Sequence, residues 1–155
     1  MKIMFVCHGN ICRSPMAEFV MRDLISREGL SSSVEVASSA TSTEEIYNGV
    51  GNPVYPPAVR ELEKHGLSCE GKRAVRLCAS DGAEYDMLIG MDSNNIRNMK
   101  RMIEEKYHGK IYKLMDFTSR GTDVQDPWYT DRFDITYRDV YEGCVGLLSW
   151  IKERL

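Results

Sequence analysis

Directly after a short apolar segment, the chain carries the sequence Val6-Cys7-His8-Gly9-Asn10-Ile11-Cys12-Arg13-Ser14-Pro15. A thiol and a guanidinium stand at the two ends of one tight loop. Ser14 and Pro15 are typical of the first positions of a helix. Because the start of a helix has unpaired N–H groups and the positive end of its dipole, it binds tetrahedral anions and stabilises a nearby thiolate. The stretch therefore predicts an anion-binding loop with a reactive cysteine.

The flanking sequence alternates between short apolar runs and helical patterns. Strands are predicted at Lys2–Val6, Val34–Ala37, Tyr85–Met91 and Lys110–Leu114. Helices are predicted from Ser14 to Gly29, from the loop Asn52–Pro57 to Gly66, from Asp92 through Tyr107, and from Tyr137 to Leu155. This alternation predicts an α/β fold: one domain over residues 1–155, with a four-stranded parallel sheet and helices on both faces. The phosphate-binding loop would lie between strand 1 and helix 1.

Ligands in such folds bind beyond the carboxyl ends of the strands. The Cys7 loop, the polar stretch Ser38–Thr43 and Asp92 are all expected at such ends, although a helix cap is the favoured role for Asp92. The stretch Asp116–Phe133 has no periodicity. An irregular segment of that length in a compact domain is usually functional or mobile.

Composition excludes several classes of protein. The 155 residues are 43% hydrophobic and 28% charged, with a net charge of −3, which is ordinary for a globular protein and argues against nucleic-acid binding. No apolar run is long enough for a membrane span or a signal peptide, so a cytoplasmic location is expected. The five cysteines include no C-x-x-C pair, and the three histidines have no zinc-site spacing. We therefore expect reduced thiols and no metal.

Cys7 is the candidate nucleophile. Its thiolate would attack phosphorus and form a cysteinyl-phosphate, while Arg13 and the backbone N–H groups of the loop hold the phosphate oxygens. Gly9 permits close approach of the phosphate, and Asn10 tolerates the left-handed conformation that a tight loop needs. Ser14 is placed to donate a hydrogen bond to the sulfur of Cys7.

A phenolate is a poor leaving group at neutral pH. Cleavage of the bond between phosphorus and a tyrosyl oxygen therefore needs a general acid that protonates this oxygen. The sequence Asp126-Pro127-Trp128-Tyr129 offers one inside the irregular stretch. Pro127 would keep Asp126 extended, and the two aromatic residues would form walls for an aryl ring. Trp128 has a second, equally favoured interpretation, in which it fixes the loop to the body of the protein. Cys12 has two as well: a disulfide partner for Cys7, or a small apolar filler under the loop.

These residues resemble the low-molecular-weight protein tyrosine phosphatases over essentially the whole chain. The resemblance rests on the Cys7–Pro15 loop, on Ser38-Ser39-Ala40-Thr41, His65-Gly66-Leu67, Met91-Asp92-x-Asn94, and on the distal Asp-Pro-aromatic-Tyr motif. It implies Cys7 as nucleophile, Arg13 as phosphate ligand, Asp126 as acid, Ser14 as assistant, Asn10 as a loop-stabilising residue and Cys12 as the partner in reversible oxidation. It implies no metal or cofactor.

The chain departs from the family pattern in places. His8 and Trp128 stand where many members have Leu and Tyr, and the segment Lys72-Arg73-Ala74 lacks a histidine that many relatives place near the loop. Ile11 resembles the tyrosine-specific members, because the related protein-arginine phosphatases typically have Thr there.

The alternative activities are protein-arginine phosphatase and an arsenate reductase-like thiol-redox enzyme, which would need Cys69 or Cys78 as a relay. We expect the partners of the protein to be phosphotyrosine-containing proteins, with inorganic phosphate or other oxyanions as product and inhibitor. We expect neither nucleic acid nor membrane as a partner, and a monomer.

Overall fold

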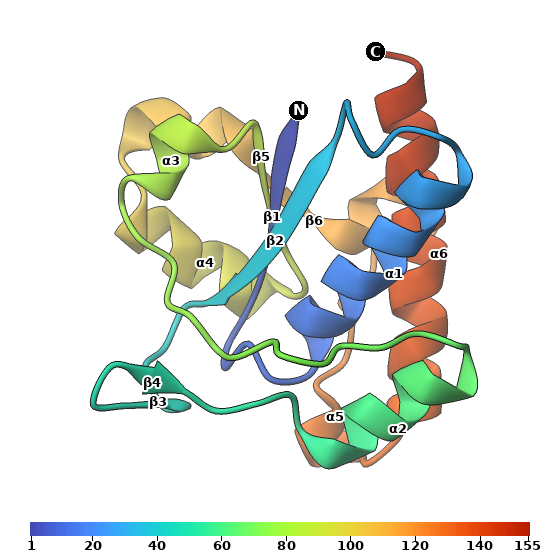
Figure 1. Ribbon diagram of the computed structural model, residues 1–155. Helices are drawn as coiled ribbons and strands as arrows, with labels where there is room; N and C mark the ends of the chain where they lie inside the picture. The colour runs from blue at the N-terminus through green and yellow to red at the C-terminus, as the bar shows by residue number, and fades with distance from the viewer.

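The computed structural model describes residues 1–155 and has a four-stranded parallel sheet at its centre (Figure 1). The strands lie in the order β2-β1-β5-β6, with the bounds β1 (Lys2–Cys7), β2 (Glu35–Ala40), β5 (Met87–Gly90) and β6 (Ile111–Lys113). A separate antiparallel hairpin consists of β3 (Ile46–Tyr47) and β4 (Val50–Gly51). The predicted α/β fold with four parallel strands is confirmed.

Helices cover both faces of the sheet (Figure 1). One side holds α1 (Arg13–Arg27) and α6 (Phe133–Lys152), with α2 (Pro56–Lys64) against α6; the other holds α3 (Asp81–Glu84) and α4 (Ser93–Met102). The connections contain two 3₁₀ helices, η1 (Glu105–Lys110) and η2 (Leu114–Phe117), and the short helix α5 (Pro127–Thr130). No helix is both long and apolar enough to cross a membrane.

Strand β1 is buried on both faces, which explains its uninterrupted apolar sequence. Ile3, Phe5 and Cys7 belong to the larger hydrophobic core, which α1 and α6 complete, whereas Met4 and Val6 belong to a smaller core shared with α4. Cys7 pairs with the last residue of β2, and the neighbouring Val6 pairs with the last residue of β5. The segments that leave these three strands therefore emerge at one edge of the sheet.

The first helix begins differently from the prediction. α1 starts at Arg13, and Cys12 occupies the N-cap position without a side-chain cap bond. Ser14 does not cap the helix, because its hydroxyl lies 3.0 Å from the sulfur of Cys7 and takes part in the loop instead. The predicted end is correct: Gly29 adopts φ +70° just after the helix.

Three other predictions need correction. The helix expected to continue to Tyr107 ends at Met102, because Ile103 is extended, and Tyr107 lies in the separate helix η1. The polar stretch that begins at Ser38 is part of β2 as far as Ala40. Leu155 lies beyond the end of α6 and is exposed rather than in the core. The irregular region 116–133 contains the end of η2, the short helix α5 and, at Phe133, the first residue of α6, which thus begins before the predicted Tyr137.

Candidate active site

The loop between β1 and α1 surrounds the sulfur of Cys7. The backbone N–H of Asn10 donates to the sulfur at 3.3 Å, and the Ser14 hydroxyl lies 3.0 Å from the sulfur. Asn10 has φ +59°, the left-handed conformation that its place in the loop predicts. The loop thus bends back on itself so that donors converge on one thiol.

The side chain of Asn10 holds the loop to its surroundings. Its amide nitrogen donates to Ser14 Oγ at 2.7 Å and to Ser38 Oγ at 3.0 Å, and its amide oxygen accepts from the N–H of Val75 at 3.0 Å. Asn10 is fully buried. Because Ser14 Oγ accepts from Asn10, its own hydrogen is free for the sulfur of Cys7, which is nearer than its other acceptor, the carbonyl of Ser39 at 3.4 Å.

A buried carboxylate, which the sequence analysis did not identify, extends this network. Ser38 Oγ donates to Glu18 Oε1 at 2.6 Å, so its lone pairs face Asn10. Lys72 Nζ lies 3.6 Å from Glu18 Oε1 and donates to the carbonyl of Ser38 at 3.0 Å. Burial lowers the pKa of the Lys72 ammonium. Lys72 thus lies in the segment where, by the resemblance described above, many relatives have a histidine. Glu18 follows Ser14 by one helical turn of α1, and this spacing from the loop was the available signal for it.

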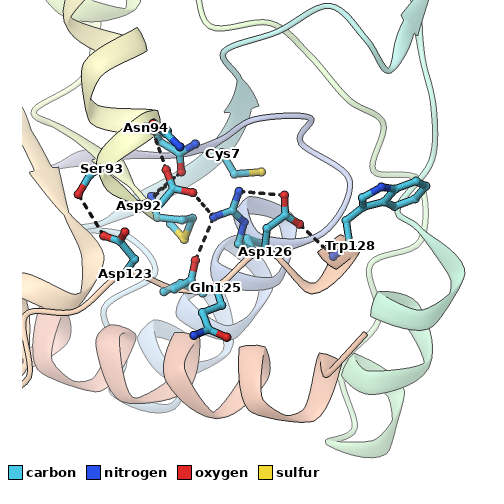
Figure 2. A network of polar contacts seen from close by, with 12 residues as sticks. Cys7, Asp92, Ser93, Asn94, Asp123, Gln125, Asp126 and Trp128 are labelled. Carbon is cyan, nitrogen blue, oxygen red and sulfur yellow. Dashed lines mark hydrogen bonds and ion pairs between the residues drawn. The ribbon is translucent and has the colours of Figure 1, made fainter. Parts of the chain in front are cut away.

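Arg13 lies at the floor of the site and is 3% exposed. Its Nη1 donates to Asp92 Oδ2 at 2.6 Å and to the carbonyl of Val124 at 3.0 Å, and its Nη2 is 3.6 Å from Asp126 Oδ2. Figure 2 shows Asp92 and Asp126 on opposite sides of one side chain, which the two ion pairs identify as Arg13. Burial disfavours the charge, yet the negative charges of Cys7, Asp92 and Asp126 raise the pKa of Arg13. The guanidinium is therefore charged and oriented.

Asp92 has two roles. It caps α4, accepting from the N–H of Asn95 at 2.7 Å within a reciprocal capping box, as the sequence predicts. Its second oxygen binds Arg13, a contact that the cap prediction did not include. Its place at the carboxyl end of a strand, opposite an arginine of the loop, was the available signal.

The substitution Asp92→Asn separates these roles, because asparagine is also a good helix cap but carries no charge for Arg13. We expect the free energy of unfolding to fall by about 1.5–3 kcal/mol, the usual worth of a charged hydrogen bond, and inorganic phosphate to bind more weakly. Denaturant unfolding and calorimetric titration with phosphate measure the two effects. Asp92→Ala, which loses the cap as well, should be about 1 kcal/mol less stable again. Wild-type stability and phosphate affinity in Asp92→Asn would contradict the role of the ion pair.

Asp126 caps the N-terminus of the short helix α5. One oxygen accepts from the N–H of Trp128 at 3.0 Å, and the other faces Arg13. Its side chain is 29% exposed, so it reaches both the floor and the solvent. The preceding residues are fixed, because the N–H of Val124 bonds to the carbonyl of Met91 and Asp123 accepts from Ser93 and Lys113.

A cleft of about 250 Å³ opens above Cys7 and Arg13. The other residues that line it are His8, Gly9, Ile11, Cys12, Glu44, Glu45, Asp126, Trp128 and Tyr129. Nearly every predicted site residue thus lies at one cleft, while Ser14 and Asn10 lie beneath it. The sequence analysis missed Glu44 and Glu45, which follow β2 on the same edge of the sheet.

The aromatic residues of the cleft are exposed. Tyr129 is 85% exposed and Trp128 is 62% exposed, although the indole also packs against Tyr55 with ring centroids 5.4 Å apart. Trp128 therefore lines the cleft and also packs α5 against the residue before α2.

Cys12 is buried and has a free thiol, as has Cys7. Burial, aided by the negative charges of Cys7 and Asp126, raises the pKa of the Cys12 thiol. The Cys12 thiol is therefore protonated at neutral pH. No group of three or more His, Cys, Asp or Glu side chains is arranged to hold a metal ion.

Fold and site together define an α/β protein with a cysteine- and arginine-containing anion-binding loop. The family model of the low molecular weight phosphotyrosine protein phosphatases matches residues 2–155. The chain belongs to this family.

Individual relatives agree with that assignment. The low molecular weight protein-tyrosine-phosphatase YfkJ of Bacillus subtilis is 34% identical over 153 residues, 97% of this chain and 96% of that protein. The crystal structure of YfkJ matches this chain with a TM-score of 0.93 and 33% sequence identity. The matched region makes up 99% of this chain and 96% of the YfkJ chain. PtpA of Staphylococcus aureus strain Newman is 33% identical over 96% of this chain and 92% of its own length. The crystal structure of a YwlE mutant from Bacillus subtilis matches this chain with a TM-score of 0.84 and 25% sequence identity. The matched region makes up 98% of this chain and 99% of the YwlE chain.

Proposed function

We propose that the protein hydrolyses phosphotyrosine and small aryl phosphates through a cysteinyl-phosphate intermediate, without a metal ion. The observation that carries this proposal is the convergence of three groups on one cleft: the sulfur of Cys7, the buried guanidinium of Arg13, and Asp126 at 3.6 Å from that guanidinium. These groups supply a nucleophile, an electrophilic clamp and a proton donor.

In the first step, the thiolate of Cys7 attacks phosphorus in line with the bond to the aryl oxygen. The S–P bond forms as the P–O bond breaks, and the carboxylic acid of Asp126 gives its proton to the leaving oxygen. Arg13 and the N–H groups of the loop hold the equatorial oxygens through the transition state. Asp92 supports this step by orienting Arg13.

In the second step, Asp126 takes a proton from a water molecule that attacks the cysteinyl-phosphate. The S–P bond breaks, inorganic phosphate leaves, and the thiolate returns. The Ser14 hydroxyl, whose hydrogen the Asn10 network leaves free for the sulfur, stabilises the departing thiolate. Phosphate and similar oxyanions should therefore act as product inhibitors.

A relative supports the covalent step. YwlE is described as an arginine phosphatase, and in one structure a mutant with serine in place of cysteine carries a phosphorylated active-site serine. That protein is 25% identical to this chain. Transfer of phosphate to a side chain of the loop is therefore chemistry that this fold supports.

The proposed substrate class is phosphotyrosine in proteins. Ile11 gives the cleft an apolar wall, and the exposed rings of Trp128 and Tyr129 can flank an aryl group. Protein-arginine phosphatase activity is the second candidate, on the strength of the similarity to YwlE. The reductase alternative has less support, because neither Cys69 nor Cys78 lines the cleft.

The test of this function is phosphate release from three peptides that differ only in carrying phosphotyrosine, phosphoserine or phosphoarginine, measured in the presence of a chelator. We expect strong preference for phosphotyrosine. Preference for phosphoarginine would be compatible with the proposed mechanism but would overturn phosphotyrosine as the proposed substrate. No release from any of the peptides by folded protein would overturn the phosphatase proposal.

The substitution Asp126→Asn tests the general acid. We expect kcat to fall by about 10²–10⁴-fold with phenyl phosphate, since phenolate needs the proton to leave. With a nitrophenyl phosphate of low leaving-group pKa, the fall should be much smaller. A series of aryl phosphates measures the dependence of rate on leaving-group pKa, which should become steeper in the variant. Equal losses across the series would contradict the acid role.

A further inference from the structure

A further polar contact lies at the mouth of the cleft, away from the phosphate-binding floor. His8 Nε2 is 3.0 Å from Glu44 Oε2, and the side chains are 47% and 68% exposed. Both residues line the cleft. Neither takes part in the chemical steps proposed above, so the contact needs another explanation.

The backbone holds this contact in place beside the reacting atoms. The carbonyl of His8, the residue after Cys7, accepts hydrogen bonds from the N–H and the hydroxyl of Ser42 at 3.1 and 2.9 Å. The Asn52 side chain donates to Glu45 at 2.7 Å. The segment that carries Glu44 is therefore tied to the catalytic loop on one side and to the end of the β3–β4 hairpin on the other.

The charges that face the cleft differ between its floor and its mouth. At the floor, the permanent cation Arg13 is 3% exposed and is already bonded to Asp92. Toward solvent, the acidic side chains of the cleft are Glu44 and Glu45 together with Asp126, the proposed proton donor; the other ionisable residues there are Cys7, Cys12, His8 and Tyr129. A peptide whose phosphate reaches the floor must therefore pass the carboxylates with its flanking residues.

We propose that Glu44 is a specificity-determining residue that favours lysine or arginine next to the phosphotyrosine, and that His8 competes with the substrate for it. Glu44 already contacts a basic side chain, that of His8, and a cationic side chain of the substrate could take the place of His8 in this contact. The inference rests on the phosphatase function proposed above and names a narrower substrate class for the same site.

The competition predicts the effect of removing the imidazole. His8→Leu takes away the side chain that contacts Glu44 Oε2, so Glu44 is left for the substrate. The preference for a basic flank should therefore be higher in His8→Leu than in the wild type.

The experiment compares kcat/KM for three phosphotyrosine peptides that differ only in Lys, Gln or Glu at the flanking positions. In the wild type at pH 8 and low salt, we expect the Lys peptide to exceed the Gln peptide by about two- to fivefold, the range of an exposed ion pair. Glu44→Gln should bring this ratio close to one. The matched control is Glu35→Gln, which removes the same charge at the start of β2, the opposite edge of the sheet, and should keep the wild-type ratio.

Ratios, rather than rates, decide between the outcomes. An unchanged Lys-to-Gln ratio in Glu44→Gln, or an equal loss of it in Glu35→Gln, would overturn the role of Glu44 while turnover of the Gln peptide still supports the phosphatase function. A Lys-to-Gln ratio in His8→Leu that is no higher than in the wild type would overturn the competition by His8. No turnover of any peptide would overturn the function and this inference together.

Discussion

Replacing Cys7 with serine is expected to lower kcat for aryl phosphates by at least about 10⁴-fold, because a serine hydroxyl lacks the nucleophilic and leaving-group properties of a thiolate. The surroundings of Cys7 suit the thiolate: Asn10 N–H, Ser14 hydroxyl and Arg13 all direct positive charge toward the sulfur. The serine is nearly isosteric, so we expect the fold and phosphate binding to remain.

The matched control for this prediction is Cys78→Ser, which makes the same replacement of sulfur by oxygen at an exposed residue outside the cleft. It should turn over like the wild type, and it also tests the reductase alternative, which needs a relay cysteine. Steady-state rates with a chromogenic aryl phosphate, together with thermal unfolding, measure both variants. Wild-type turnover in Cys7→Ser would contradict the mechanism, and a loss in Cys78→Ser would contradict a mechanism that uses only residues of the cleft.

Replacing Arg13 with lysine is expected to lower kcat/KM by about 10²–10³-fold although the charge is kept, a loss typical of removing one preorganised oxyanion donor. The guanidinium has a planar fork, whereas an ammonium is a point charge. In this site one nitrogen of Arg13 is fixed by Asp92 and Val124, and the other faces the cleft and Asp126. A lysine cannot satisfy the two anchors and bind phosphate at the same time.

The measurement for Arg13→Lys is the split between kcat and KM, with phosphate inhibition as a check on ground-state binding. We expect kcat to fall more than phosphate affinity, since the clamp acts most strongly on the transition state. A rise in KM alone would show that Arg13 only binds the substrate and would contradict its role in the transition state.

The fold was predictable because its signals are local. The apolar run of β1 and the positive-φ glycines that end α1 and α2 are properties of short segments. The errors have local causes as well. Side-chain hydrogen bonding by Ser14 replaced the expected helix cap, and buried serines continued β2 through a polar sequence. Propensity alone misses both, because the partners are tertiary.

The site was predictable only in part. Cys7, Arg13 and Ser14 lie on one short stretch of the sequence, so their spacing indicates that their side chains come together in one site. Glu18 and Lys72, by contrast, meet through Ser38, which lies on a different strand, and Glu44 reaches His8 across a loop. Contacts of this kind depend on how the segments lie in space, and no spacing along the chain encodes them.

The most direct test of the covalent mechanism is to look for the phosphoryl group on the enzyme. Wild-type protein would be mixed with an aryl phosphate carrying labelled phosphate, stopped by a rapid denaturing quench within one turnover, digested, and mapped by mass spectrometry. The account predicts transient label on the peptide that contains Cys7, with none on the sulfur of Cys12. Turnover with no label on Cys7, or with the label on another residue, would contradict it.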